Sequence, residues 1–491
     1  MSQAPAQPQH HTEVVVIGAG FGGLGMALRL QRANRSFVVL EAAASLGGTW
    51  RDNRYPGVAC DVKSHLYGLS MALNPDWSRP YAAGPEIQAY LERVAAEAGL
   101  GRHIRFGQRV VGLRWDVSGR RWHVRTQAGL WITARAVVMA HGPLHRPAYP
   151  NLPGLSDFQG EVVHTARWPE SLDLRGRTVA VVGTGASAVQ VIPAIAPQVS
   201  GLDVFQRTPA WVLPKDERPY SRLRRWAYRT LPGLARLHRA LLYASNELRM
   251  LPLRRPKLAG ALAGVVRWQI QREVADPHTA RALTPSYTLA CKRVLLSNDY
   301  LPTFNAGHVR LVTSSIQRVT PDGLRTEDGA HHPADVLILA TGFVVDPRDY
   351  LADLPIEGLN GANLGASWAA GARAYLGTTV TGFPNLFMLG GPNTGIGHTS
   401  LVFMLECQMT HVLRCLELAD ARGVAAVHPS QEALDTFDAW VQRELSRTVW
   451  ATGCRSWYQQ DDGRVFAIWP LPTWRFWWLT RRANAADYRS A

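Results

Sequence analysis

The feature that most constrains the fold is a Gly-rich loop that occurs twice, each time between an apolar strand pattern and a helix pattern. The first loop, Gly18 to Gly23, follows the β-branched run Glu13 to Ile17. The second loop, Gly183 to Ala188, follows a similar run from Thr178 to Val182. Strand, glycine turn and helix in this order form a mononucleotide-binding unit, because glycine lets the backbone turn tightly and approach a pyrophosphate. The sequence therefore predicts an α/β protein with two Rossmann-like dinucleotide-binding domains.

The first unit has the pattern of an FAD site. Gly18, Gly20 and Gly23 have the GxGxxG spacing, and the next apolar run, Phe37 to Leu40, ends in Glu41. A carboxylate about 20 residues after such a loop can accept hydrogen bonds from ribose hydroxyls. We therefore expect these three glycines and Glu41 to bind FAD.

The second unit differs where its second strand ends. The run Leu202 to Phe205 is followed by Gln206-Arg207-Thr208 in place of a carboxylate. A guanidinium pairs bidentately with a 2′-phosphate, which a carboxylate would repel. This predicts an NADPH site, whose expected ligands are Gly183, Thr184, Gly185, Ser187, Arg207 and Thr208.

Later segments predict domains that are discontinuous in sequence. At 491 residues the chain is too long for a single core. A strand pattern returns at Val336 to Leu339, and Gly390 to Gly395 precede a helix pattern from Ser400 to Leu418. The tail from Trp450 to Arg482 has few helix signals and is expected to wrap over other elements. The expected segments are residues 1–150 and 341–491 for the FAD domain, 151–215 and 281–340 for the NADPH domain, and 216–280 for a helical insertion.

The net charge of +15 is concentrated in the predicted insertion. Thirteen Lys or Arg and two Glu lie between Arg218 and Glu273. Clustered arginines without interleaved binding motifs are usually a solvated face, so we expect no nucleic-acid partner and at most a weak contact with a membrane surface. Glycines and prolines interrupt the uncharged stretch from Thr178 to Leu202, which argues against a transmembrane segment.

Two further features bear on the compartment and on metals. Met1 to Thr12 has neither a basic nor an apolar signal region, so a cytoplasmic location is expected. The cysteines are odd in number and form no CxxC pair, which argues against a disulfide framework, a zinc site or a dithiol redox centre. We therefore expect no metal, and a buried thiol at each of Cys60, Cys291, Cys407, Cys415 and Cys454.

Two longer motifs resemble those of the type I Baeyer–Villiger monooxygenases. Gly47 to Asp61 agrees at every specified position with the long fingerprint [AG]GxWxxxx[FY]P[GM]xxxD. Phe158 to Pro169 agrees throughout with the shorter signature FxGxxxHxxxW[PD]. The resemblance extends over nearly the whole chain.

The resemblance implies an FAD-dependent, NADPH-consuming enzyme that converts ketones to esters or lactones. One oxygen atom of O2 would enter beside the ketone carbonyl through a C4a-peroxyflavin. The implied partners are a small ketone and O2, and the enzyme would be a monomer or a weak dimer.

The resemblance also implies roles for individual residues. Tyr287 to Arg293 resembles the segment in which a Lys–Arg pair enters the active site. Arg293 would be the catalytic cation, because a guanidinium keeps its positive charge beside an anion. Asp61 would orient Arg293, and Lys292 would be a second ligand of the 2′-phosphate.

Other motif residues are expected to line the cofactors or to support the fold. Thr49, Trp50 and Asp61 of the long fingerprint would contact FAD, and Trp457 would lie over the nicotinamide. His164 of the shorter signature is expected to be a structural or hinge residue.

Two other functions remain open at this point. The first is a flavin enzyme that oxygenates nitrogen or sulfur, although such soft nucleophiles need no oxyanion donor. The second is a basic flavoprotein that associates with a membrane or with nucleic acid and has no oxygenase turnover.

Overall fold

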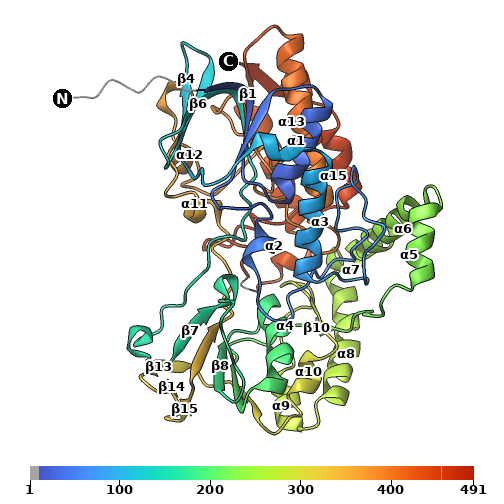
Figure 1. The fold of residues 1–491 in the computed structure, drawn as a ribbon, viewed down its shortest axis with the longest axis vertical. Helices are drawn as coiled ribbons and strands as arrows, with labels where there is room; N and C mark the ends of the chain where they lie inside the picture. Colours follow the sequence, from blue (N-terminus) through green and yellow to red (C-terminus); the bar gives the residue numbers. More distant parts are fainter. Residues whose placement is uncertain (1–9, 455) are drawn as a thin grey trace.

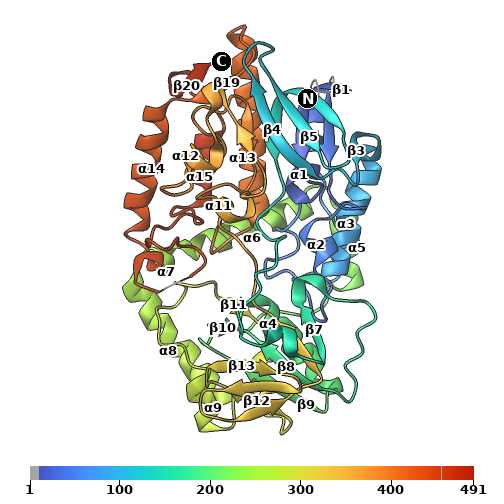
Figure 2. The same ribbon diagram turned by 90° about the vertical axis from the view of Figure 1, so that its left-hand side faces the viewer.

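Two sheets, one mixed and one parallel, each carry one Gly-rich loop and organise the computed structural model, which describes residues 10–454 and 456–491. The first sheet lies in the upper half of Figures 1 and 2, and the second lies in the lower half. The first nine residues of the expected FAD segment lie outside the described residues. This arrangement confirms the predicted α/β fold with two Rossmann-like domains.

The first sheet is built around β1 (His10–Ile17), which pairs in parallel with β2 (Phe37–Leu40) and with β6 (Trp131–Met139). The last four residues of β1 are buried, as expected for a parallel strand that is covered on both faces. Along the sheet, the described strands follow the order β17 (Ile356–Glu357), β4 (Val110–Asp116), β5 (Arg121–Thr126), β6, β1, β2 and β3 (Ile104–Arg105). One more strand, β18 (Leu386–Met388), pairs with the end of β6.

Helices α1 (Phe21–Arg32), α3 (Gly84–Glu97) and α13 (Leu401–Ala421) pack together beside this sheet (Figure 1). At Gly25 of α1 a Cβ would lie 2.6 Å from the Met409 Cε, so glycine lets α1 and α13 approach closely. Helix α13 comes near the end of the chain yet covers the first sheet. The first unit is therefore assembled from both ends of the sequence.

The second sheet contains only parallel pairs among the described strands. Its order is β12 (Val309–Val312), β9 (Gly201–Phe205), β8 (Thr178–Val182), β16 (Val336–Leu339) and β7 (Glu161–His164). The second Gly-rich loop leads from β8 into α4 (Ala186–Ile195). A small antiparallel sheet of β13 (Ile316–Thr320), β14 (Gly323–Thr326) and β15 (His331–Pro333) precedes β16.

The predicted insertion is helical. It lies between β10 (Val212–Leu213) and β11 (Leu295–Leu296), which pair in parallel. Its helices are α5 (Arg222–Thr230), α6 (Leu234–Leu248), α7 (Met250–Leu253), α8 (Pro256–Glu273) and α9 (Pro277–Ala282). Within the described residues, every helix is too short or too polar to cross a membrane.

The tail contains a helix that the sequence pattern did not predict. Helix α15 (Thr473–Thr480) buries Phe476 and Thr480, and the Thr480 hydroxyl donates a hydrogen bond to the Phe476 carbonyl at 2.8 Å. Tertiary packing of this buried side stabilises a helix whose local propensity is weak. Beyond it, β20 (Tyr488–Ser490) pairs with β19 (Val427–Pro429), after which α14 (Gln431–Leu445) begins.

The expectation of five free thiols is wrong for two cysteines. Cys291 and Cys454 form a disulfide, although 163 positions separate them in the sequence. Cys60, Cys407 and Cys415 are free and buried, as expected. An odd number of cysteines without a CxxC pair carries no information about distant residues, and the fold brings these two together. The disulfide joins the tail to the residue that precedes Lys292.

Candidate active site

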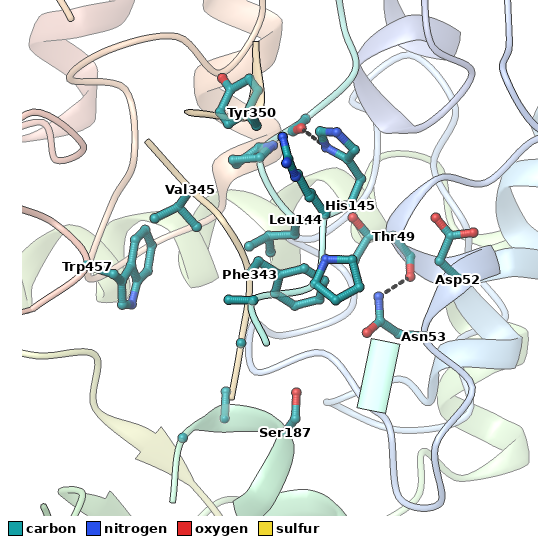
Figure 3. Close-up of a pocket in the computed structure, with 18 of the residues that line it drawn as sticks. Thr49, Asp52, Asn53, Leu144, His145, Ser187, Phe343, Val345, Tyr350 and Trp457 are labelled. Carbon is teal, nitrogen blue, oxygen red and sulfur yellow. Dashed lines mark hydrogen bonds between the residues drawn. The ribbon is translucent and has the colours of Figure 1, made fainter. Parts of the chain in front are cut away.

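A cavity of about 1900 Å³ joins the two Gly-rich loops. Pockets for one ligand usually have about 300–1,000 Å³, so this cavity has room for two dinucleotides side by side. In Figure 3, Thr49 of α2 (Thr49–Asp52), Ser187 of α4 and Trp457 of the tail surround the same space. Of the predicted site residues, Gly23 alone is missing from the described lining. The fold therefore brings nearly the whole predicted set together.

The first loop is shaped by close backbone contacts. Gly18 has a φ of +102°, and a Cβ there would lie 2.8 Å from the Ala140 carbonyl oxygen. A Cβ at Gly23 would overlap the Gly18 carbonyl oxygen, so Gly23 supports the loop from behind. Gly20 is the N-cap of α1, and no described side chain caps this helix. The N–H groups at the start of α1 are therefore available to an anion, which suits a pyrophosphate.

Glu41 is fixed beside this loop. Its side chain is buried, and its Oε2 accepts a hydrogen bond from the Ala19 N–H at 2.8 Å. Its Oε1 accepts hydrogen bonds from the Ala43 N–H at 2.9 Å and from the Arg51 Nη1 at 3.1 Å. The carboxylate thus lies at the strand end where a ribose is expected, and the residues present fit FAD.

The second loop has the same geometry, with more free space around its last glycine, Gly185. Gly183 has a φ of +118°, and a Cβ there would lie 2.6 Å from the Ala340 carbonyl oxygen. Gly185 caps α4, and no described heavy atom lies within 4 Å of its Cβ position. The Thr184 hydroxyl donates a hydrogen bond to the Thr208 carbonyl at 2.8 Å, which ties the loop to the segment after β9. The loop therefore leaves room for a second phosphate group.

Two cations lie next to this second loop. Arg207 is exposed at the end of β9, and both it and Lys292 line the cavity. Partial burial lowers the pKa of Lys292 below its usual range, and the nearby charge of Arg207 lowers it further. The Lys292 ammonium also lies 4.9 Å from the centre of the Tyr287 ring. Two neighbouring positive charges at this place suit a phosphate, which would relieve their repulsion.

Arg293 and Asp61 form a two-point ion pair inside the cavity. The Arg293 Nε donates to the Asp61 Oδ2 at 2.6 Å, and the Nη2 donates to the Oδ1 at 2.7 Å. The attraction of Asp61 raises the pKa of Arg293 above its usual range. Burial alone would raise the pKa of Asp61, but attraction to Arg293 outweighs it, so the pKa of Asp61 lies below its ordinary value. Both groups therefore stay charged, and within the described residues the Arg293 Nη1 donates no hydrogen bond.

Tyr458 is a neighbour of Arg293 that the sequence argument missed. Its side chain is buried, and its hydroxyl has no hydrogen-bond partner among the described residues. Burial raises the pKa of Tyr458 to about 12, although the charge of Arg293 acts in the opposite direction. The motif that singled out Trp457 also contains Tyr458, but only its position in the fold identifies it as part of the site. Trp457 itself is 48% exposed at the cavity wall.

The long fingerprint also connects the two units. The Tyr55 hydroxyl donates a hydrogen bond to the Gln190 Oε1 at 2.8 Å, and the Gln190 Nε2 donates to the Ala59 carbonyl at 2.9 Å. Gln190 belongs to α4 of the second unit, and no sequence motif indicated this role. The Trp50 Nε1 of the fingerprint donates to the hydroxyl of Tyr67, which follows the motif, at 3.2 Å. Within the fingerprint, the Asn53 side chain donates to the Thr49 carbonyl at 2.8 Å (Figure 3).

His164 has the environment of a structural residue. It is buried at the end of β7, where its Nδ1 accepts a hydrogen bond from the Ala166 N–H at 3.1 Å. Its Nε2 lies 3.3 Å from the Thr341 hydroxyl. These contacts support the expected structural role at the start of the second unit.

Comparisons with known proteins agree with this geometry. A family model described as pyridine nucleotide-disulphide oxidoreductase matches residues 15–247. A Baeyer–Villiger monooxygenase from Pseudomonas aeruginosa is 42% identical over 482 residues, which cover 97% of this chain and 91% of that protein.

Solved structures resemble the fold over almost its full length. An oxidized steroid monooxygenase bound to NADP matches with a TM-score of 0.87 and 33% identity, covering 98% of this chain and 99% of that chain. OTEMO in complex with FAD and NADP matches with a TM-score of 0.87 and 29% identity over the same shares. The two fingerprints, the two dinucleotide loops and the near-complete alignment lead to one conclusion: the chain belongs to the Baeyer–Villiger monooxygenase family.

Proposed function

We propose that this enzyme uses NADPH and O2 to convert ketones into esters or lactones, with FAD bound at the first Gly-rich loop. The observation that carries the proposal is the Arg293–Asp61 ion pair, which lies in the cavity between the two loops. FAD would supply the redox chemistry by accepting a hydride from NADPH and activating O2. The protein supplies binding, orientation and fixed charge.

The proposed cofactor ligands follow the two loops. The lining of the first loop supports FAD binding by Gly18, Gly20, Glu41, Thr49, Trp50 and Asp61, with Gly23 holding the loop in shape. The lining of the second supports NADPH binding by Gly183, Thr184, Gly185, Ser187, Arg207, Thr208 and Lys292, with Trp457 over the nicotinamide.

Arg293 is proposed as the catalytic cation and Asp61 as its positioning partner. Asp61 engages the Nε and Nη2 of Arg293, so the guanidinium is held in one orientation and its Nη1 can donate to a substrate oxygen. Negative charge develops on the ketone oxygen when the carbonyl carbon is attacked. A fixed positive donor at that place stabilises the transition state more than the bound ketone.

The alternative functions are less well supported. Oxygen transfer to nitrogen or sulfur creates no oxyanion, so it gives no reason for a preoriented arginine in the cavity. A binding function without turnover would not explain why two dinucleotide loops share one cavity with an ion pair.

The domain division is proposed from the chain path. Residues 1–150 and 341–491 would form the FAD domain, residues 151–215 and 281–340 the NADPH domain, and residues 216–280 the insertion. We also propose a monomer or weak dimer that works in the cytoplasm.

A panel of linear, cyclic and aryl ketones tests the function directly. The purified enzyme should be yellow, with about one FAD per chain, and should form an ester or lactone with NADPH and O2. Oxygenation of amines or thioethers together with unchanged ketones would favour the alternative flavin oxygenase. A colourless protein that FAD cannot reconstitute would contradict the whole proposal.

A further inference from the structure

The helical insertion and α15 have apolar side chains on their outward faces. On α6, the outward residues Leu237, Leu241 and Leu248 are 57%, 60% and 66% exposed. On α15, Trp474, Trp477 and Trp478 are 51%, 43% and 67% exposed. These residues recur at the three- and four-residue spacings of one helix face, so each helix has an apolar stripe that faces solvent.

Helix α8 repeats this arrangement. Its inward residues Ala259, Ala263, Val266 and Ile270 are buried in the core. Its outward side has a second apolar stripe formed by Leu258, Leu262, Val265 and Trp268. The packing of α8 on the protein is complete without the second stripe. A surface helix normally has polar residues there, so the outward stripe indicates contact with something else.

Contacts connect these helices to one another. The Tyr243 hydroxyl of α6 lies 3.1 Å from the Thr473 hydroxyl at the start of α15. The insertion helices follow each other in contact, and α5, α6, α8 and α15 all lie on the right-hand side in Figure 1. We call the exposed side of α5, α6, α8 and α15 the outer face.

The outer face is also strongly basic. Of the two Glu residues between Arg218 and Glu273, Glu247 points inward, where its Oε2 accepts the Thr473 N–H at 3.0 Å and its Oε1 accepts the Thr473 hydroxyl at 2.6 Å. The exposed basic residues on the helices of the outer face and at their ends include Arg222, Arg236, Arg249, Arg255, Lys257, Arg267, Arg272, Arg475 and Arg481.

Several of these arginines lie directly over tryptophan rings. The Arg481 guanidinium is 4.4 Å from the centre of the Trp477 ring, and that of Arg272 is 5.4 Å from the Trp268 ring. Paired aromatic and cationic side chains of this kind suit the boundary between lipid tails and charged headgroups.

We propose that the outer face binds the surface of an anionic lipid bilayer. The Leu and Trp side chains would enter the interface, and the surrounding Arg and Lys would pair with lipid phosphates. A nucleic acid would pair with the positive charges, but its binding would not explain the exposed leucine stripes. A second copy of the chain in a symmetric dimer would place this basic face against itself, which repulsion disfavours.

Vesicle binding of the FAD-loaded full chain tests this inference without requiring turnover. The enzyme should sediment with vesicles of phosphatidylcholine and phosphatidylglycerol, and much less with phosphatidylcholine alone. Binding should weaken steeply as salt is added, because screening reduces attraction between surface charges.

Two sets of variants separate the apolar contribution from the charged one. The double variant Leu248→Ser, Trp478→Ser should lose at least about tenfold in partitioning, because two apolar side chains no longer enter the interface. Its control is Phe106→Ser, Val117→Ser, which changes exposed apolar residues outside the outer face and should bind normally.

The charge variants follow the same design. Arg249→Gln, Arg255→Gln and Lys257→Gln should each cost about fivefold in partitioning to anionic vesicles. Their controls Arg114→Gln, Arg120→Gln and Arg125→Gln remove exposed charges near the β4–β5 hairpin and should cost much less. Flavin absorbance and turnover of a water-soluble ketone should be the same in all variants, which shows that they are folded.

Three results would overturn the inference. The first is equal binding to neutral and anionic vesicles, or equal losses in the test and control variants. The second is a dimer that Leu248→Ser, Trp478→Ser dissociates, with no vesicle binding by the unmodified enzyme. The third is salt-sensitive binding to DNA in place of vesicles. Failure to oxidise ketones would leave all three readouts intact, so the two proposals fail independently.

Discussion

Replacing Arg293 by Ala should separate cofactor reduction from oxygen insertion. The substitution leaves both Gly-rich loops and Arg207 intact, so FAD should still bind and NADPH should still reduce it. Asp61 holds two of the guanidinium nitrogens at 2.6 and 2.7 Å, and the Nη1 is the proposed donor to the substrate oxygen. Loss of one donor to a developing oxyanion costs about 3–4 kcal/mol, or about 10²–10³ in rate.

The assay compares ester or lactone formed with NADPH consumed. In Arg293→Ala this ratio should fall close to zero, and the oxygen that is consumed should appear as hydrogen peroxide. Arg293→Lys keeps a positive charge but cannot form the two-point contact with Asp61, so its ratio should lie between those of the Ala variant and the unmodified enzyme.

A stability measurement completes the experiment. Arg293→Ala leaves Asp61 without its partner, which costs about 1–3 kcal/mol of folding free energy. Asp61→Asn in the same background removes that unpaired charge and should recover part of the stability without recovering product formation. An unchanged product ratio in a folded, flavin-loaded Arg293→Ala enzyme would refute the assignment of Arg293 as the catalytic cation.

Three further predictions concern the loops and the insertion. The unmodified enzyme should prefer NADPH to NADH. Arg207→Ala should raise the KM for NADPH about 5- to 150-fold, which corresponds to about 1–3 kcal/mol, and should leave the KM for NADH unchanged. Equal use of both cofactors by the unmodified enzyme would contradict the assignment. Gly20→Ala should fold normally, because its Cβ would have no neighbour closer than 3.7 Å, but it should lose FAD. Gly23→Ala should be destabilised, because its Cβ would overlap the Gly18 carbonyl oxygen. Melting temperature and flavin content distinguish the two variants. Burial, followed by nearby positive charges, lowers the pKa of His65 to about 3, so folding stability should fall as the pH drops from about 6.5 towards that value, because only the unfolded chain takes up the proton. The melting temperature of His65→Asn should therefore fall less between about pH 7 and pH 5 than that of the unmodified enzyme, and an equal fall in both would contradict this prediction.

The parts of the fold that depend on local pattern could be predicted from the sequence. Strands β2 and β8 have the bounds that their apolar runs indicated, and α13 begins within one residue of its predicted start. Glycine spacing and hydrophobic period are local properties, so the sequence alone determines them. The cavity lining follows for the same reason, because both loops come at the ends of parallel strands.

Features that depend on distant contacts could not be predicted. The Cys291–Cys454 disulfide and the Tyr55–Gln190 hydrogen bond join segments that only the tertiary fold brings together. The sequence also could not predict the orientation of α6, because an apolar stripe at helical spacing gives the same pattern whether it faces a core or solvent. Periodicity reports that such a stripe exists, and the surroundings decide what it contacts.

The pairing of β18 with β6 also has a consequence for synthesis of the chain on the ribosome. The strands of the second sheet have all been made once Leu339 is added, but Val137 to Met139 of β6 must wait for Leu386 to Met388 before their outer edge is paired. During that interval the nascent protein exposes an open strand edge in its first sheet, and such edges invite mispairing with other chains. The strands of the second sheet can therefore pair first, and the flavin site depends on the last quarter of translation.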